Sequence, residues 1–509
     1  MSERLSSADV SFFYLETTSS PQHVGGIAIF AAPAPAGEGP GFDYERLVGL
    51  LEERIALVPR YRQKMRTVPG NLAHPVWVDD ANFDITYHVR RSALPRPGTD
   101  AQLLEFCARV QSRLLDRDRP LWEMYLIEGL SSGRVVIMSK THHSMVDGID
   151  ALDITQVLLD ESPEPRRSGS TLWMPQPEPS STQLVLEALA GVVHRPAELA
   201  EAVRLDARST SGWLAGVCAG VGSAAASLVR SGRVWPLSAA VGEQRRLAVA
   251  RTRLEDYRQV RRVQGGTVND VMIATVAGAL RGWLLSRGQT LGPAATVRAL
   301  VPVSVREAVG PTPAGPDDCG SAGAVRATLV DLPVGEAEPL RRLAQIRNAT
   351  GAQQQSGRSV GADALVALSG FAPPTLHSLG ARAANGLTRR MFDLVVANVP
   401  GPQHPLYAAG ARMTEIFPVL PLGRGHAVSI GLTSYDGGVY FGVNADRDAV
   451  PDVQVLADLV IESLAELVAA SPQREVAVAP SPGFSLRQAR AAGSHHPFRA
   501  AQEAREPQP

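Results

Sequence analysis

Two apolar segments that follow each other closely constrain the fold of this chain more than any other feature. Residues 122–130 and 134–139 both have the composition of strands, and only Ser131, Ser132 and Gly133 lie between them. So short a connection predicts an antiparallel hairpin. Helical spacing returns shortly after the second segment, so the last residues of that strand lie where the backbone leaves the sheet.

Helical and β-rich segments alternate along the rest of the chain and predict a mixed α/β (α+β) fold. The clearest helices are expected at 43–57, 268–285 and 453–469, the first with its leucines on one face. A further strand is expected at 298–305. A second hairpin is expected over 428–443, around an Asp-Gly-Gly turn.

Changes in composition divide the 509 residues, a length that suggests two or three domains. We expect a first domain over residues 1–165, a Pro- and Ser-rich linker with a weakly periodic helical segment over 166–250, and a second domain over 251–472. The tail, 473–509, is rich in Pro, Arg and Ala and is expected to be disordered. Residues 211–229 carry no charge, but they are mostly Gly, Ala and Ser, which favours a helical linker over a membrane span.

Charge and cysteine content exclude several classes of protein. The net charge of −1 gives no basic field for nucleic acid. Cys107, Cys218 and Cys319 are far apart and form no CxxC motif, so neither a disulfide framework nor a zinc site is expected, and a reducing compartment fits best. Residues 1–9 mix both charge signs without an apolar core, unlike a signal peptide. A cytoplasmic location is expected.

The segment Thr141–Gly148, Thr-His-His-Ser-Met-Val-Asp-Gly, carries the clearest chemistry. A neutral imidazole, with an unperturbed pKa of about 6.5, can remove a proton from a hydroxyl near pH 7. Neighbouring residues of a strand point to opposite faces, so one of His142 and His143 is expected to be the base and the other to support the loop. Asp147 is placed to fix the loop by pairing with an arginine, and Gly148 permits the turn into the next helix.

Three other patterns predict different chemistry less well. A metal site is disfavoured, because adjacent histidines on a strand diverge and no third ligand lies at a useful spacing. Residues 129–133 fit GxSxG, but a strand follows where the hydrolase elbow needs a helix, so Ser131 is expected at a hairpin tip. Gly220-Val221-Gly222 follows no strand and is a poor dinucleotide site.

His142-His143-Ser144-Met145-Val146-Asp147-Gly148 matches the HHxxxDG motif of the coenzyme-A-dependent acyltransferase superfamily, which includes chloramphenicol acetyltransferase and the condensation domains of peptide synthetases. Together with that motif, several segments spread over residues 5–470 resemble the bacterial wax ester synthase/diacylglycerol acyltransferase family. They are Ser7-Ala8-Asp9, Pro21–Gly26, Pro120-Leu121-Trp122, Asn269-Asp270-Val271, Val301–Arg306 and Asn398–Pro402. The DFGWG-type motif of plant relatives is absent.

The resemblance implies two chloramphenicol-acetyltransferase-like domains with mixed sheets and an active-site channel between them. It implies that His143 is the general base, that His142 supports it, and that Asp147 is structural, with Arg306 as its expected partner. It also places three polar residues close to the channel: Asn269, Asp270 and Asn398. The first two could equally cap the helix that they open, and Trp122 is expected to be structural.

By the same resemblance, the chain moves a long-chain acyl group from acyl-CoA to diacylglycerol or a long-chain alcohol, without a covalent intermediate. Acyl-CoA is a co-substrate, and no cofactor or metal is expected. Two alternatives are a non-catalytic lipid-binding relative and an acyltransferase for a polyketide or glycolipid alcohol. Arg245-Arg246 or Arg261-Arg262 could meet the coenzyme A phosphates. Lipid substrates also suggest peripheral contact with the inner face of the membrane or with lipid bodies.

Overall fold

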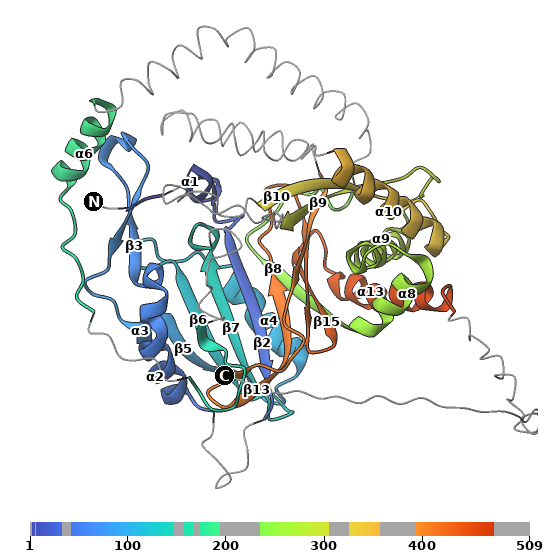
Figure 1. Ribbon diagram of the computed structural model, residues 1–509, viewed down its shortest axis with the longest axis horizontal. Helices are drawn as coiled ribbons and strands as arrows, with labels where there is room; N and C mark the ends of the chain where they lie inside the picture. Colours follow the sequence, from blue (N-terminus) through green and yellow to red (C-terminus); the bar gives the residue numbers. More distant parts are fainter. Residues whose placement is uncertain are drawn as a thin grey trace, which may run out of the picture. The chain divides into compact units, whose positions relative to one another are not determined.

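A computed structural model describes residues 3–5, 7–32, 42–146, 157–166, 173–193, 235–304, 325–356 and 392–472. These residues form two six-stranded sheets and one three-stranded sheet, with helices packed on them (Figure 1). Both large sheets mix parallel and antiparallel pairs, as the sequence predicted.

The elements of the first half of the chain build the first large sheet and the small one. They are β1 (Glu3–Arg4), α1 (Ser7–Leu15), β2 (His23–Phe30), α2 (Tyr44–Arg54), β3 (Gln63–Arg66), β4 (Val76–Asp79), α3 (Ile85–His88), β5 (Val89–Ala93), α4 (Asp100–Gln111), β6 (Trp122–Glu128), β7 (Val135–His142) and α6 (Ser181–Val193). Short 3-10 turns are η1 (Ile55–Leu57), η2 (Pro59–Arg62), η3 (Pro69–Asn71) and η4 (His143–Met145).

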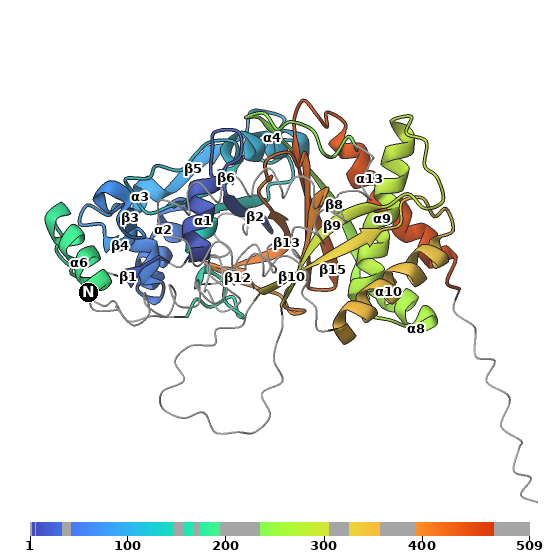
Figure 2. The same ribbon diagram turned by 90° about the horizontal axis from the view of Figure 1, so that it is seen from above.

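Most elements of the second half build the other large sheet and its helical layer, and two of its strands belong to the first large sheet. They are β8 (Arg245–Arg253), α8 (Leu254–Gln264), α9 (Val268–Ser286), β9 (Val297–Ser304), β10 (Val325–Leu332), α10 (Pro339–Ser356), β11 (Leu394–Pro400), β12 (Tyr407–Ala408), β13 (Ala411–Val419), β14 (Val428–Tyr435), β15 (Gly438–Asp446) and α13 (Val453–Ala469). Helices α8, α9, α10 and α13 lie together on one side of this sheet (Figure 1, Figure 2).

The first large sheet has the strand order β12-β13-β2-β7-β6-β5, and the second has β10-β9-β11-β14-β15-β8. Strand β13 therefore lies in the first sheet. The strands that precede and follow the β12–β13 pair in the chain, β11 and β14, both lie in the second. Strand β13 pairs with β2, where Pro418 is opposite Gly26. Between β11 and β14 the chain thus passes from the second sheet to the first and back.

Alternating side chains of the first sheet enter two separate cores. Ile27 and Ile29 pack with α4 residues such as Leu103, whereas Ala28 and Phe30 pack on the opposite side with residues of α2. This period-two pattern is typical of a sheet that is covered on both faces. The sheet can therefore hold the end of β7 in a fixed place.

Both predicted hairpins are confirmed. Strands β6 and β7 pair antiparallel across residues 129–134. Strands β14 and β15 do so across Asp436 and Gly437, which both have positive φ, 44° and 80°. Two successive residues of this kind make the tight turn whose twist matches the paired strands. Ser131 lies in the first hairpin turn, as expected, and not at a strand-to-helix elbow.

The predicted helices at 43–57, 268–285 and 453–469 are confirmed as α2 with η1, α9 and α13. In α2, Leu47 and Leu51 are fully buried. Helix α9 is long and apolar enough to cross a membrane by length and composition, but 72% of its most apolar window is buried within the protein. That burial is typical of a core helix.

The expected helical character of 166–250 is wrong at its C-terminal end. Strand β8 begins at Arg245, at the edge of the second sheet beside β15. Leu247, Ala248 and Ala250 enter the core from this strand, and α8 follows it directly. Residues 211–229, the tail 473–509 and residues 147–156, where helical spacing was expected to return after the motif, lie outside the described residues.

Candidate active site

The two motif histidines lie where the sequence predicted, at the point where β7 leaves the sheet. His142 is the last residue of β7 and pairs with His23 of β2. His143 is the first residue of η4, and its backbone N–H donates to the carbonyl oxygen of Gln22 at 2.8 Å. Strand β2 and the residue before it therefore fix the backbone that carries both imidazoles.

His142 is buried and its ring is engaged on both sides. The backbone N–H of Ser144 donates to Nδ1 at 3.1 Å, and the Ser144 hydroxyl lies 2.7 Å from the same atom. Because Nδ1 accepts, the proton of the neutral ring is on Nε2. Nε2 faces Glu16 Oε1 at 3.6 Å. Burial lowers the pKa of His142 to about 3, so this imidazole is neutral at pH 7.

His143 has a different environment, since it is only partly buried. Its ring stacks on Phe12 of α1, with ring centroids 3.9 Å apart and an interplanar angle of 19°. Helix α1 packs against η4 over this contact. The aromatic contact restricts the rotation of the imidazole, as a positioned base requires.

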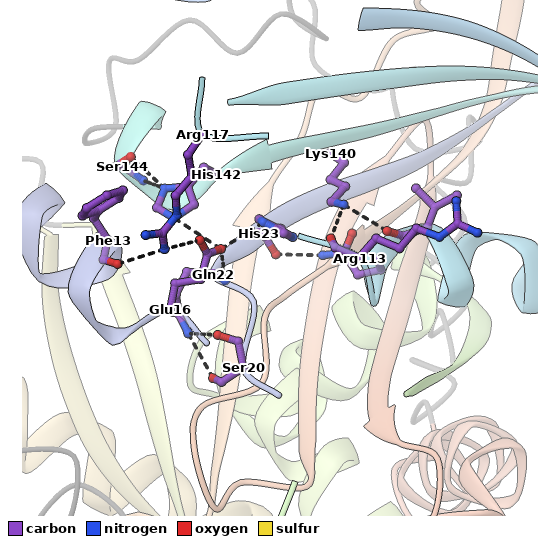
Figure 3. Close-up of polar contacts among 12 residues, drawn as sticks. Phe13, Glu16, Ser20, Gln22, His23, Arg113, Arg117, Lys140, His142 and Ser144 are labelled. Atoms are coloured by element: carbon purple, nitrogen blue, oxygen red, sulfur yellow. Dashed lines mark hydrogen bonds and ion pairs between the residues drawn. The ribbon is translucent and has the colours of Figure 1, made fainter. Parts of the chain in front are cut away.

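A buried carboxylate beneath the motif is the main functional feature that sequence reasoning missed. Glu16 follows α1 directly, and its side chain is 2% exposed. Oε1 lies 3.0 Å from His23 Nε2, and Oε2 accepts from Arg117 at 2.8 Å. Figure 3 shows the carboxylate at the centre of these groups, with His142 on one side and His23 on the other.

These contacts set the charge of the cluster. Burial alone would raise the pKa of Glu16, but the His23 imidazole, the field of His142 and the Arg117 guanidinium outweigh it and lower the pKa to about 2. Burial also lowers the pKa of His23. The cluster therefore holds one carboxylate and one guanidinium beside two neutral imidazoles at pH 7. A single glutamate at the end of an apolar run is a weak signal, but it was visible in the sequence.

The predicted channel residues Asn269 and Asn398 come together from α9 and β11. Asn398 Nδ2 donates to Asn269 Oδ1 at 2.9 Å. Asp270 is buried and has a structural role, because it forms the capping box of α9 with Thr267. It also accepts from the Thr350 hydroxyl at 2.7 Å.

The remaining predicted site residues divide into two groups. Asp147, Gly148 and Arg306 lie outside the described residues. Trp122 is fully buried and its indole N–H donates to Tyr61 O at 2.8 Å, which is a packing role. Among the residues that the structure describes, no group of three His, Cys, Asp or Glu side chains could hold a metal ion.

This arrangement of sheets defines a fold class. The first condensation domain of the CDA synthetase is similar over 93% of this chain and 97% of its own, with a TM-score of 0.53 and 15% identity. At that identity the likeness shows the fold alone, and it confirms the predicted chloramphenicol-acetyltransferase-like class. The chain therefore shares the chloramphenicol-acetyltransferase-like fold of this condensation domain.

Closer similarities identify the family. The descriptions "Wax ester synthase/diacylglycerol acyltransferase catalytic domain" and "WS/DGAT C-terminal domain" match residues 5–272 and 324–468. The probable diacylglycerol O-acyltransferase tgs1 of Mycobacterium tuberculosis is 32% identical over 458 residues, 89% of this chain and 92% of that protein. The wax ester synthase/diacylglycerol acyltransferase of Marinobacter aquaeolei VT8 has a TM-score of 0.64 and 27% identity, covering 92% and 99% of the chains. The chain belongs to the wax ester synthase/diacylglycerol acyltransferase family, as its motifs predicted, and is an acyltransferase.

Proposed function

We propose that this enzyme transfers a long-chain acyl group from acyl-CoA to the hydroxyl of diacylglycerol or a long-chain alcohol, with His143 as the general base. The reaction uses acyl-CoA as a co-substrate and needs no resident cofactor. The products are triacylglycerol or wax ester and free coenzyme A.

The contrast between the two imidazoles is the observation that carries this proposal. His142 is 1% exposed, and its Nδ1 already accepts from Ser144. His143 is partly exposed at the end of the strand and is held by Phe12. A base must lie within hydrogen-bond reach of the hydroxyl that it deprotonates. Of the two rings, His143 is the one that an incoming alcohol can approach.

The proposed reaction is a direct transfer and forms no covalent enzyme intermediate. The His143 imidazole takes the hydroxyl proton while the alcohol oxygen attacks the thioester carbonyl carbon. The tetrahedral intermediate then collapses, the carbon–sulfur bond breaks, and the departing thiolate takes the proton from the imidazolium. His142 and Glu16 hold the loop that carries the base, and neither group exchanges a proton with the substrate.

The joined amides of Asn269 and Asn398 support a second element of the proposal. Oδ1 of Asn398 is buried and has no hydrogen-bond partner among the described residues. A buried acceptor without a partner is costly, and a hydroxyl or amide of a bound substrate would satisfy it. We place these two residues on the wall of the substrate channel.

Thiol release from palmitoyl-CoA in the presence of diacylglycerol or hexadecanol tests the base. General-base catalysis is worth about 10²–10⁴-fold, so His143→Ala should lose activity by that factor while its melting temperature stays near that of the wild type. His142→Ala should lower the melting temperature and cost less activity per folded molecule. His404→Ala, which removes an exposed imidazole, is the control.

Two results would contradict the proposal. Equal rates for His143→Ala and wild type would remove His143 from the mechanism. Binding of palmitoyl-CoA without ester formation from diacylglycerol or any alcohol offered would instead favour a non-catalytic lipid-binding protein. Lipid analysis of the products would separate triacylglycerol from wax ester synthesis.

A further inference from the structure

A hollow of about 520 Å³ lies beside the Glu16 cluster, outside the motif and outside the predicted channel residues. It is formed by the end of α4, the loop after Glu16 and the residues before β8. The lining residues used below are Thr18, Arg109, Ser112, Arg113, Glu243 and Gln244. No step of the acyl transfer proposed above uses this hollow.

The exposed charge in the hollow is predominantly positive, with two guanidiniums against one carboxylate. Arg109 and Arg113 are four residues apart and both are exposed. Among the residues that the structure describes, Arg109 has one distant ionic contact, 3.9 Å, with the exposed carboxylate of Glu105, which is worth little in water. In the described ranges, no carboxylate lies at ion-pair distance from Arg113. Glu243 is the carboxylate of the lining.

Two buried cations reinforce this charge from behind. Lys140 is fully buried, and its ammonium donates to the carbonyl oxygens of Val110 and Arg113. The carbonyl end of a helix normally repels an anion, and here an ammonium covers it. Burial lowers the pKa of Lys140 to about 8, so the group is mostly charged at pH 7.

Arg245 is the second buried cation, and it fixes the other wall. Its guanidinium donates to the carbonyl oxygens of Gly242, Gln244 and Ser19. Its backbone N–H donates to the Ser112 hydroxyl at 3.1 Å. Neither Lys140 nor Arg245 has a carboxylate at ion-pair distance in the part of the chain that the structure describes. The carboxylates that act on them from beyond that distance are Glu123 and Glu16 for Lys140 and Asp446 for Arg245.

The hollow is connected to the candidate base by one short segment. Thr18 lines the hollow, and the carbonyl of Gln22 holds the backbone of His143. Four residues span at most about 14 Å. Figure 3 shows Lys140 and Arg113 on one side of His23 and His142 on the other.

We propose that this hollow binds the phosphate groups of the acyl-CoA donor, with Arg109 and Arg113 as their ligands. The inference rests on the proposed acyl transfer and assigns a place to its donor. Coenzyme A has its phosphates at one end and its thioester at the other, separated by the pantetheine arm, which matches a cationic hollow at a distance from the base. Planar guanidiniums bind phosphate through paired hydrogen bonds.

The sequence-based candidates for this role fit less well. Arg245 is buried and its N–H groups are occupied by carbonyl oxygens, and Arg246 donates to Pro451 O. Arg262 pairs with Glu255 at 2.7 Å on the exposed face of α8. Neither pair lines the hollow.

Initial rates with two donors test the proposal. In Arg109→Gln/Arg113→Gln, the KM for palmitoyl-CoA should rise about tenfold or more, since charged hydrogen bonds are worth roughly this much each, while kcat changes little. The KM for palmitoyl-pantetheine, which lacks all phosphates, should not change. Glu243→Gln should lower the KM for palmitoyl-CoA. This change is opposite in sign to that of the arginine variant, and damage to the fold would not produce it.

A matched control comes from α8. Arg258 lies 3.9 Å from Glu255, the same distance as in the pair of Arg109 with Glu105, and Arg261 is also exposed. Arg258→Gln/Arg261→Gln should leave both KM values unchanged. An unchanged KM for palmitoyl-CoA in the hollow variant, or an equal rise for palmitoyl-pantetheine, would overturn the proposal.

Calorimetric titration separates this inference from the acyl transfer itself. Free coenzyme A should bind the wild type and bind the hollow variant about tenfold more weakly, even if no ester were ever formed. Millimolar inorganic phosphate should compete weakly. If the hollow variant lost binding to phosphatidylglycerol vesicles but kept coenzyme A binding, the hollow would bind a lipid headgroup, and the proposal would be wrong.

Discussion

Glu16 is a buried carboxylate in contact with two imidazoles and a guanidinium, and it connects α1 to the strand that carries the motif. Oε1 faces His23 and His142, while Oε2 accepts from Arg117. Glu16 is 2% exposed and Arg117 is 44% exposed, so the contacts of the carboxylate must offset the cost of burying its own charge. Its contribution to stability should therefore depend on pH.

The substitution Glu16→Gln tests this dependence. The pKa of Glu16 is about 2 in the folded chain against 4.5 ordinarily, so its stabilisation is fully present above about pH 4.5 and is lost as the pH falls toward 2. That difference corresponds to about 3 kcal/mol. In urea unfolding, the free energy of unfolding of the wild type should exceed that of Glu16→Gln most at pH 6–7. The two free energies should converge as the pH falls toward 2. Glu105→Gln, an exposed carboxylate, is the control. Parallel profiles of wild type and Glu16→Gln would refute the assignment.

The sequence predicted the residues of the motif but not the side chains that contact them. The strand-to-loop position of His142 and His143 follows from local patterns, because a hairpin and a helical spacing flank the pair. Glu16 and Arg117 are about a hundred residues apart, and Arg117 reaches the carboxylate where it packs over the Phe13 ring of α1. A long-range ion pair leaves no period in one sequence.

Among the elements, β13 makes the contact that joins the two large sheets. Pro418 of this strand stands against Gly431 of β14 and Gly442 of β15, which pair with each other. A Cβ on Gly442 would lie 2.0 Å from the carbonyl oxygen of Pro418. Glycine is required there because another backbone approaches closely.

The substitution Gly442→Ala should therefore destabilise the fold by about 1–3 kcal/mol, because the backbone of β13 must move to make room. A Cβ on Gly49, in the exposed face of α2, meets nothing within 4 Å. Gly49→Ala should stabilise by about 0.5–1 kcal/mol. Chemical denaturation of both variants measures the contrast. A Gly442→Ala protein as stable as the wild type would mean that the sheets are not in contact at Pro418.

Hairpins and long helices could be predicted because their signals are local, as in β14–β15 and α13. Strands β8 and β13 could not. The Leu-Ala-Val-Ala run of β8 is short and follows an Ala- and Gly-rich stretch, and β13 contains Pro418 and pairs with β2 across almost four hundred residues. Pairing at such separation is decided by the cores on either side and not by the propensity of the strand.

The chain passes from the second sheet to the first and back through β13, and this path has a consequence for the stability of the whole molecule. Strand β2 is flanked by β7 and β13, so the first sheet is complete only when the second half of the chain contributes β13. Without β13, β2 would present an open edge. Residues 405–420 are in turn anchored at both ends by β11 and β14 of the second sheet. Neither sheet can lose its structure while the other keeps all its partners.

We therefore expect both sheets to unfold in one transition. Hydrogen exchange in increasing urea, followed by mass spectrometry, should give the amides of β7 and β14 the same free energy of opening, although large chains often unfold in stages. Gly442→Ala, which disturbs the contact between the sheets, should lower both values equally. Exchange of β14 at lower urea than β7, or an effect of Gly442→Ala on one sheet only, would show two independent folding units. The pairing of β13 with β2 would then not couple the stability of the two sheets. It would have no part in holding the candidate base at the end of β7.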